Sequence, residues 1–130
     1  MFDLVCDVRH YPEFLGWVRS ACVHDQSDAE QTASLAVTLG GIRAQFTTLN
    51  QLSRPEGIEM RLREGPFEDL KGNWRFSRAG SGCRVSLDLT FRFAGSVWMR
   101  PFRRGFSRMA DRMVDDFCRR AGEVYGQAAS

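Results

Sequence analysis

The chain has 130 residues, 43% of them hydrophobic and 26% charged, which suits a single globular domain with one core. A net charge of +2 is too small to indicate nucleic-acid binding by itself, and no apolar run approaches the length of a membrane-spanning helix. The four cysteines are far apart and the start has no basic segment, so we expect reduced thiols in a cytoplasmic protein without a signal peptide.

The first residues predict a short helix and then a turn that packs inward. Phe2–Val8 has apolar residues at helical spacing. Pro12 disfavours the α conformation at Tyr11, and the segment Tyr11–Trp17 contains four large apolar side chains. A surface turn rarely exposes so much apolar area, so we expect these side chains to face the core.

Six strands are predicted in the middle of the chain. Apolar and polar residues alternate in each of them, with the period of two that a half-buried strand requires. Short turns such as Gly40-Gly41 separate the strands. The predicted ranges are Arg19–His24, Thr32–Leu39, Ile42–Leu52, Ile58–Arg63, Leu70–Phe76 and Cys83–Phe93. Because each strand has one apolar face, we expect an antiparallel sheet that is covered on one side.

The last predicted element is a long amphipathic helix over Val97–Tyr125, with Pro101 in its first turn. Its apolar stripe comprises Trp98, Phe102, Phe106, Met109, Met113, Phe117, Ala121 and Val124. No other element is long enough to cover the sheet. The sequence therefore predicts an α+β fold over residues 1–130, in which a curved antiparallel sheet of about six strands surrounds this helix.

The residues expected to face inward do not form a catalytic constellation. His10 adjoins the predicted turn, His24 lies near an exposed strand end, and the acidic residues of the strands fall on outward rows or in turns. No Gly-rich phosphate loop and no metal-ligand spacing is present. We therefore expect a protein that is not an enzyme, without catalytic residues, metal or cofactor.

The inward-facing residues are mainly aromatic, with methionines among them. Flexible methionine beside aromatic rings makes an adaptable apolar surface, and Thr48 and Asn50 on the same face are typical of the few polar groups in a ligand pocket. The alternative is an ordinary packed core, with both polar side chains satisfied by backbone groups near a strand end. The candidate ligand-binding residues are Tyr11, Phe14, Leu15, Trp17, Phe46, Thr48, Asn50, Trp74, Phe76, Phe91, Phe93, Phe102, Phe106, Met109, Met113 and Phe117.

The N-terminal half of the predicted helix carries unbalanced positive charge. Arg100, Arg103, Arg104 and Arg108 precede its first acid, Asp111, and positive charge at this end opposes the helix dipole. An anionic partner would explain the arrangement, either phospholipid headgroups at a membrane surface or ribosomal RNA. A solvated surface with acidic neighbours is the alternative.

Four short segments share a characteristic order and spacing: Tyr11–Leu15, Phe46–Asn50, Gly65–Phe67 and Gly72–Phe76. Together they resemble the coenzyme Q-binding START-like family of the polyketide cyclase/dehydrase superfamily, whose bacterial members include ribosome-association toxins (the RatA group). The resemblance extends from Met1 to about Tyr125. It implies a helix-grip (START/Bet v 1-like) fold with an apolar cavity between sheet and helix.

Two departures from the family are visible. Family members usually have Pro where this chain has Gly16, which loosens the turn at the expected cavity mouth. They also begin with one more strand before the first helix. Without that strand we expect an unpaired sheet edge and a missing cavity wall.

Three functions follow from these observations and from the resemblance. The first is non-enzymatic binding of a polyprenyl quinone such as ubiquinone, or a similar lipid, in support of the respiratory chain and at the periphery of the inner membrane. The second is binding to the large ribosomal subunit, which blocks subunit joining. The third is a polyketide cyclase or aromatase activity, for which only Thr48 and Asn50 offer inward polar groups.

Overall fold

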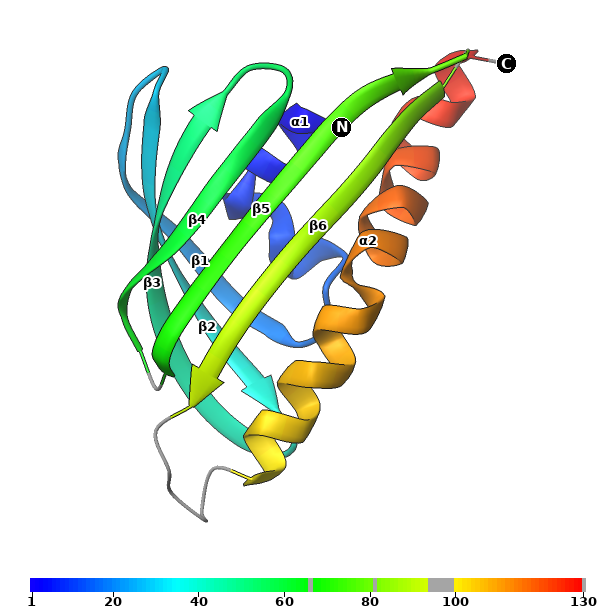
Figure 1. Cartoon of the computed structure of the whole chain (residues 1–130). Helices are drawn as coiled ribbons and strands as arrows, with labels where there is room; N and C mark the ends of the chain where they lie inside the picture. The colour runs from blue at the N-terminus through cyan, green and yellow to red at the C-terminus, as the bar shows by residue number, and fades with distance from the viewer. Residues whose placement is uncertain (66, 81, 94–99, 130) are drawn as a thin grey trace.

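The computed structural model describes residues 1–65, 67–80, 82–93 and 100–129, which form one curved sheet around one long helix (Figure 1). The six strands pair in sequence order, each antiparallel to the next. The elements are α1 (Phe2–Cys6), the 3-10 helix η1 (Val8–Glu13), β1 (Val18–Gln26), β2 (Glu30–Leu39), β3 (Ile42–Ser53), β4 (Gly57–Glu64), β5 (Phe67–Ala79), β6 (Gly82–Phe93) and α2 (Arg100–Ala129). The predicted α+β helix-grip arrangement is confirmed.

Some predictions fall on residues that the structure does not describe. These are positions 66 and 81 in two predicted turns and positions 97–99 at the predicted helix start. Among the described residues, no helix combines the length and the apolarity that crossing a membrane requires. The cysteines at positions 6 and 22 are free thiols.

Burial alternates along the strands as the sequence predicts. In β3, Phe46, Thr48, Asn50 and Leu52 are buried and face the helix, whereas Gln45 and its outward neighbours are more exposed. This alternation orients a continuous apolar surface toward α2.

Ser34 in β2 departs from that alternation, because it is buried although it lies on the outer row. Its Oγ lies 2.6 Å from Nε2 of His24 in β1 and 2.5 Å from Oγ1 of Thr47 in β3. Side chains of both neighbouring strands therefore cover this hydroxyl. The first strand is also longer than predicted, since it begins at Val18 and ends at Gln26.

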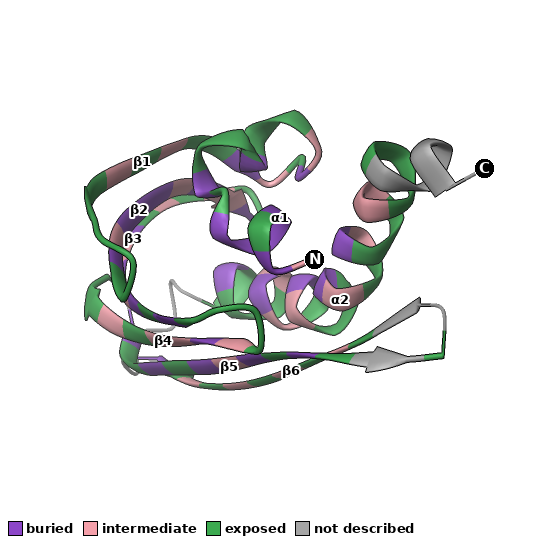
Figure 2. Cartoon of the chain, turned by 90° about the horizontal axis from the view of Figure 1, so that it is seen from above, coloured by how far each residue is buried: buried purple, intermediate pink, exposed green. Residues whose placement is uncertain are grey.

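The cover of the sheet is shared between three helices, which corrects the prediction that α2 alone provides it. Figure 2 shows α1 beside α2 within the curve of the sheet. The ring of Phe2 contacts that of Phe76 at 6.0 Å, and the ring of Tyr11 contacts that of Phe117 at 5.2 Å. Pro12 lies inside η1, where a turn was predicted. The predicted inward packing holds for Tyr11 and Leu15, which are buried.

Strands β1 and β6 form the two edges of the described sheet. Four inward residues of β6 are only partly buried, although they face the same side as the buried residues of β5; they are Val85, Leu87, Leu89 and Phe91. Phe93, at the end of the strand, is buried. At the other end of the apolar stripe of α2, Val124 is 47% exposed, which corrects its predicted place in the core.

Two glycines allow the β2–β3 turn to touch the first turns of α2. Gly40 has φ +58°, and a Cβ there would lie 2.0 Å from the carbonyl oxygen of Pro101. A Cβ at Gly105 would lie 2.8 Å from the backbone nitrogen of Gly40 and 3.1 Å from the Leu39 backbone. Both glycines are therefore required by close approach of two backbones.

The substitution Gly105→Ala is expected to lower the free energy of unfolding by about 1–3 kcal/mol, because its methyl group must push the helix away from the turn. Gly122→Ala in the same helix is the matched control, since nothing lies within 4 Å of its Cβ position. There, alanine should raise stability by up to about 1 kcal/mol, as at any exposed helix position. Urea denaturation of both variants tests whether the two changes in the free energy of unfolding have opposite signs. Equal changes would contradict the close contact between the β2–β3 turn and the helix.

Candidate functional site

Aromatic rings from the helix and the sheet pack directly against each other. The ring centroid of Phe106 lies 4.7 Å from that of Phe91 and 5.0 Å from that of Phe67, and Phe102 lies 5.8 Å from Phe93. Phe102 is fully buried. These rings fill the space between the N-terminal half of α2 and the strands β5 and β6.

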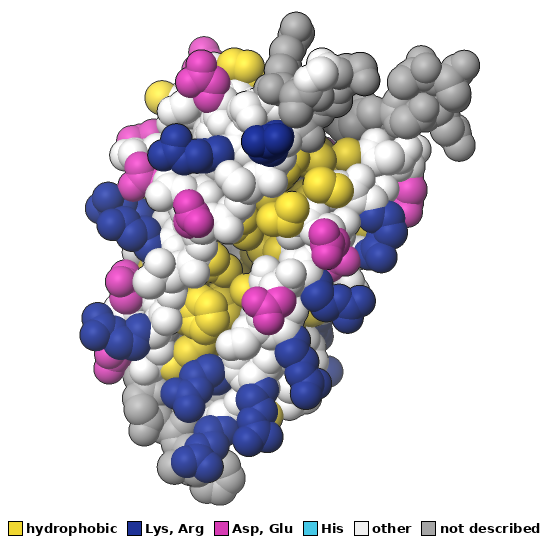
Figure 3. Space-filling model, turned by 45° about the vertical axis from the view of Figure 1, so that its right-hand side comes forward, with side chains coloured by type: hydrophobic (Ala, Val, Ile, Leu, Met, Phe, Trp, Pro, Cys, Tyr) yellow, Lys and Arg dark blue, Asp and Glu magenta, His cyan; other side chains and the backbone are white. Residues whose placement is uncertain are grey.

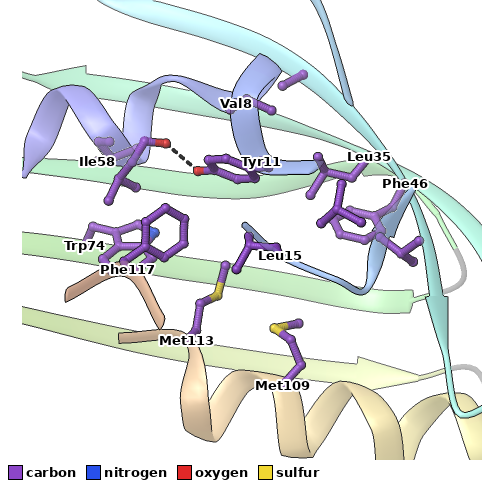
Figure 4. Close-up of a cluster of buried hydrophobic side chains, with 14 of the residues drawn as sticks. Val8, Tyr11, Leu15, Leu35, Phe46, Ile58, Trp74, Met109, Met113 and Phe117 are labelled. Carbon is purple, nitrogen blue, oxygen red and sulfur yellow. Dashed lines mark hydrogen bonds between the residues drawn. The ribbon is translucent and has the colours of Figure 1, made fainter. Parts of the chain in front are cut away.

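A second group of rings joins the middle of α2 to the N-terminal helices. Phe117 is fully buried, and its centroid lies 5.2 Å from both Trp74 and Tyr11 (Figure 4). The Tyr11 hydroxyl donates a hydrogen bond to the carbonyl oxygen of Val5, and complete burial raises the pKa of this phenol far above its usual value. Tyr11 is therefore a fixed neutral donor that connects η1 to α1.

A central cavity of about 50 Å³ remains between these two groups. Pockets that bind small molecules usually measure about 300–1,000 Å³, so this cavity is too small for a prenyl chain. The predicted wide hollow between sheet and helix is therefore wrong for this conformation. The reason is that side chains of Met109, Met113 and the neighbouring rings extend into the space that the ribbons enclose (Figure 4).

The structure brings part of the predicted set together around this cavity. The predicted residues that line it are Tyr11, Trp17, Phe46, Thr48, Asn50, Phe106, Met109 and Met113. The remaining predicted residues do not line the cavity: Trp74, Phe93, Phe102 and Phe117 belong to the surrounding core cluster, and Phe91 packs against it. Phe14 and Leu15 line a separate surface cleft, and Phe76 lines a hollow near the N-terminus.

Other cavity-lining residues were missed by sequence reasoning. They are Val8, Ala33, Leu35, Met60, Leu70 and Leu89. The strand members among them lie on the predicted inward rows, so alternation placed them on the correct face but could not distinguish cavity wall from packed core.

The polar side chains at the cavity belong to a buried chain of hydrogen bonds. Thr48 Oγ1 donates to Asn50 Oδ1 at 3.0 Å, and Asn50 Nδ2 donates to Gln31 Oε1 at 2.9 Å. Gln31, which is 2% exposed, donates through Nε2 to the carbonyl oxygen of Cys6 at 2.8 Å. Neighbouring side chains thus satisfy Thr48 and Asn50, and not the backbone groups that the packed-core alternative invoked. The chain also links β2 and β3 to the end of α1.

A second cleft of about 270 Å³ opens at the surface beside α2. Trp17 and Met109 line both this cleft and the central cavity, so their side chains separate the two spaces. Nε1 of Trp17 is buried from solvent and has no hydrogen-bond partner among the described residues. The cleft side of this partition carries Arg108, Arg112 and the Arg119–Asp116 ion pair, whose N···O distance is 2.8 Å.

The predicted arginine face of α2 is exposed to solvent. It consists of Arg100, Arg103, Arg104 and Arg108, and the first turn of α2 has no acidic residue. No hydrogen bond or ion pair joins any of the four to another described residue. Figure 3 shows arginine side chains gathered over this half of the helix, with hydrophobic side chains visible beside them. The positive charge here is therefore not neutralised within the described part of the chain.

A wider surface hollow of about 1020 Å³ lies near the N-terminus, away from the predicted site. Its walls carry charges of both signs, including Asp3, Arg54, Glu56 and Arg75. Arg54 binds Asp3 at 2.8 Å and lies over the Phe2 ring at 4.8 Å. This open hollow lacks the apolar enclosure that was predicted for the ligand site.

Comparison with known proteins gives a consistent assignment. The family model described as "Polyketide cyclase / dehydrase and lipid transport" matches residues 1–118. The ribosome association toxin RatA of Pseudomonas aeruginosa is 42% identical over 127 residues, which cover 97% of this chain and 88% of the relative. The mitochondrial coenzyme Q-binding protein COQ10 homolog B of Xenopus laevis is 24% identical over 132 residues, which cover 98% of this chain and 54% of the relative.

Two solved structures show the same fold. The Zhui aromatase/cyclase from Streptomyces sp. R1128 superposes with a TM-score of 0.81 at 17% identity, covering 99% of this chain and 88% of the other. A START superfamily protein from Mycobacterium smegmatis gives a TM-score of 0.71 at 14% identity, covering 95% and 88%. The curved sheet and the helix it surrounds thus define a START-like, helix-grip domain. The chain belongs to the polyketide cyclase/dehydrase and lipid transport family, and to its RatA group.

Replacing Gln31 by leucine is expected to lower the free energy of unfolding by about 1–3 kcal/mol, because the carbonyl of Cys6 and the Asn50 amide lose their buried partner. Gln45→Leu on the exposed side of β3 is the control and should change stability by less than about 0.5 kcal/mol. Thermal or urea unfolding measures both, and a neutral Gln31→Leu variant would show that the hydrogen-bond chain does not stabilise the fold.

Proposed function

We propose that this protein associates with the large ribosomal subunit through the arginine face of α2 and thereby blocks subunit joining. The observation that carries the proposal is the 42% identity, over 97% of this chain, to a protein named ribosome association toxin RatA. Ribosome association is the second of the functions that the sequence suggests, and the comparisons favour it over quinone binding. A cytoplasmic location is part of the same proposal.

The charge arrangement on α2 supports an RNA-rich partner. Four exposed arginines without partners among the described residues stand over two turns of one helix, where bidentate guanidinium groups can contact phosphates. Binding would release condensed counterions from the RNA. The favourable contacts would also offset the cost of placing positive charge at the helix N-terminus.

The double variant Arg103→Glu/Arg104→Glu is expected to lose binding to purified large subunits, because it replaces phosphate attraction by repulsion. For the wild type, the logarithm of the binding constant should fall by roughly three to four units per tenfold rise in salt if all four arginines contact phosphate. Co-sedimentation with large subunits over a salt series measures both effects.

Arg63→Glu/Arg75→Glu is the matched control, since these exposed arginines lie on the outer face of β4 and β5. It should bind like the wild type. Overexpression of the wild type, but not of the Arg103/Arg104 variant, should deplete 70S particles in a sucrose gradient. If overexpression of the wild type leaves the amount of 70S particles unchanged, the proposed function is wrong.

The second candidate function is non-enzymatic binding of a hydrophobic ligand, of the quinone or lipid class, in the central cavity. It is supported by the lipid transport description of the family, by the distant likeness to a coenzyme Q-binding protein and by the methionines of the cavity wall. The cavity of about 50 Å³ must enlarge before such a ligand fits. Unbranched methionine side chains are suited to that rearrangement.

A cyclase or aromatase function has less support. Of the described residues that line the cavity, none is an acid, a histidine, a cysteine or a base, and the hydroxyls of Tyr11 and Thr48 are both hydrogen-bonded. The structural likeness to the Zhui aromatase/cyclase, at 17% identity, concerns the fold alone. A non-enzymatic role remains our proposal.

Shortening Met113 to alanine is expected to increase the affinity for a ubiquinone with a short prenyl tail, because it enlarges the cavity without adding a polar group. It should also lower the free energy of unfolding by about 2–5 kcal/mol. Val124→Ala, at an exposed position of the same helix, is the control. Binding measured by calorimetry checks the prediction, and absence of binding to both the wild type and Met113→Ala would count against the cavity as a ligand site.

A further inference from the structure

The surface cleft beside α2 has a composition different from that of the central cavity. One of its walls is the connection from η1 to β1, with Phe14 and Leu15, and the other is α2, with Arg108 and Arg112. The cavity behind Trp17 and Met109 is lined almost entirely by apolar side chains. A charged space and an apolar space are therefore adjacent, with two side chains between them.

The cleft carries positive charge that no other described residue neutralises. Arg108 and Arg112 are exposed, and neither forms a hydrogen bond or an ion pair with another described residue. Asp116, the acid that lines the cleft, is bound by Arg119 at 2.8 Å and so does not neutralise them. Two guanidinium groups four residues apart on one helix face can hold one anionic group between them.

The boundary between the cleft and the cavity, which Trp17 and Met109 form, can also change its conformation. Met109 has a flexible unbranched side chain, and Met60 and Met113 stand behind it in the cavity wall. Trp17 contributes a buried N–H without a described partner, which leaves one hydrogen-bond donor at the boundary unsatisfied. An acceptor atom of a ligand that passes this boundary would satisfy it.

We propose that cleft and cavity together form one binding site for an anionic amphiphile. Arg108 and Arg112 hold its carboxylate or phosphate head in the cleft. Its apolar tail passes between Trp17 and Met109 and occupies the cavity as the methionine side chains move aside. The proposal rests on the second candidate function, occupancy of the cavity, and adds the charge class of the ligand and its route of entry.

The test compares three probes with the same twelve-carbon tail: dodecanoate, dodecyl phosphate and uncharged dodecanol, each below its micelle concentration. Calorimetric titration of the wild type should show at least one of the two anions binding about tenfold or more tighter than dodecanol. The anion that binds more tightly identifies the head group. Equal affinity for all three probes would overturn the proposal while leaving the cavity as a ligand site, and no binding of any probe would remove both.

The double variant Arg108→Gln/Arg112→Gln should reduce binding of the preferred anion to the level of dodecanol and leave dodecanol binding unchanged. Arg63→Gln/Arg75→Gln, on the outer face of the sheet, is the matched control and should bind like the wild type. An anion that binds the Arg108/Arg112 variant as tightly as the wild type would overturn the role of these arginines.

Methyl-labelled methionine provides the second measurement. Entry of the tail should shift the NMR signals of Met60, Met109 and Met113, which line the cavity. Binding of dodecanoate or dodecyl phosphate that leaves these three signals unchanged would mean adsorption to surface arginines only, and would also overturn the proposal.

Discussion

The packing of two phenylalanines of α2 against the sheet is the interaction on which the other features depend. Phe102 and Phe106 insert among Phe67, Phe91 and Phe93, and each such aromatic pair contributes about 0.5–1.5 kcal/mol beyond its buried area. These contacts fix the rotation of α2 about its own axis. Once that rotation is fixed, the arginines between the buried rings must point to solvent, and Met109 and Met113 must point to the cavity.

Most of the architecture could be predicted because it depends on periodic patterns. The alternation over Ile42–Leu52 and Cys83–Phe93 indicated strands with one buried face, and the spacing of three and four from Phe102 to Phe117 indicated the long helix. Glycine at positions 40 and 41 indicated the hairpin between β2 and β3. Each pattern reports which face of one element is apolar, and the observed burial agrees with it.

The interior of the site could not be predicted in the same way, because periodicity does not report how much volume side chains leave empty. The sequence placed Met109, Met113 and Phe106 on the correct face, yet their bulk reduces the expected hollow to a small cavity. The partner of Asn50 was also missed. Gln31 precedes the predicted second strand, and its amide meets Asn50 only because β2 and β3 pair in this register.

The contact between Gly40 and the start of α2 limits how this protein can move. Since the backbones of the hairpin and the helix touch at Pro101 and Gly105, the helix cannot slide along its axis without a clash. Any widening of the interior must therefore be a tilt of α2 about this contact, which displaces the C-terminal part of the helix most. Phe117 lies roughly 18 Å along the helix from Gly105, so a tilt of about 10° would displace it by about 3 Å. The glycine contact thus confines motion to the half of the helix next to Tyr11 and Trp17, and keeps the arginine-bearing half in place.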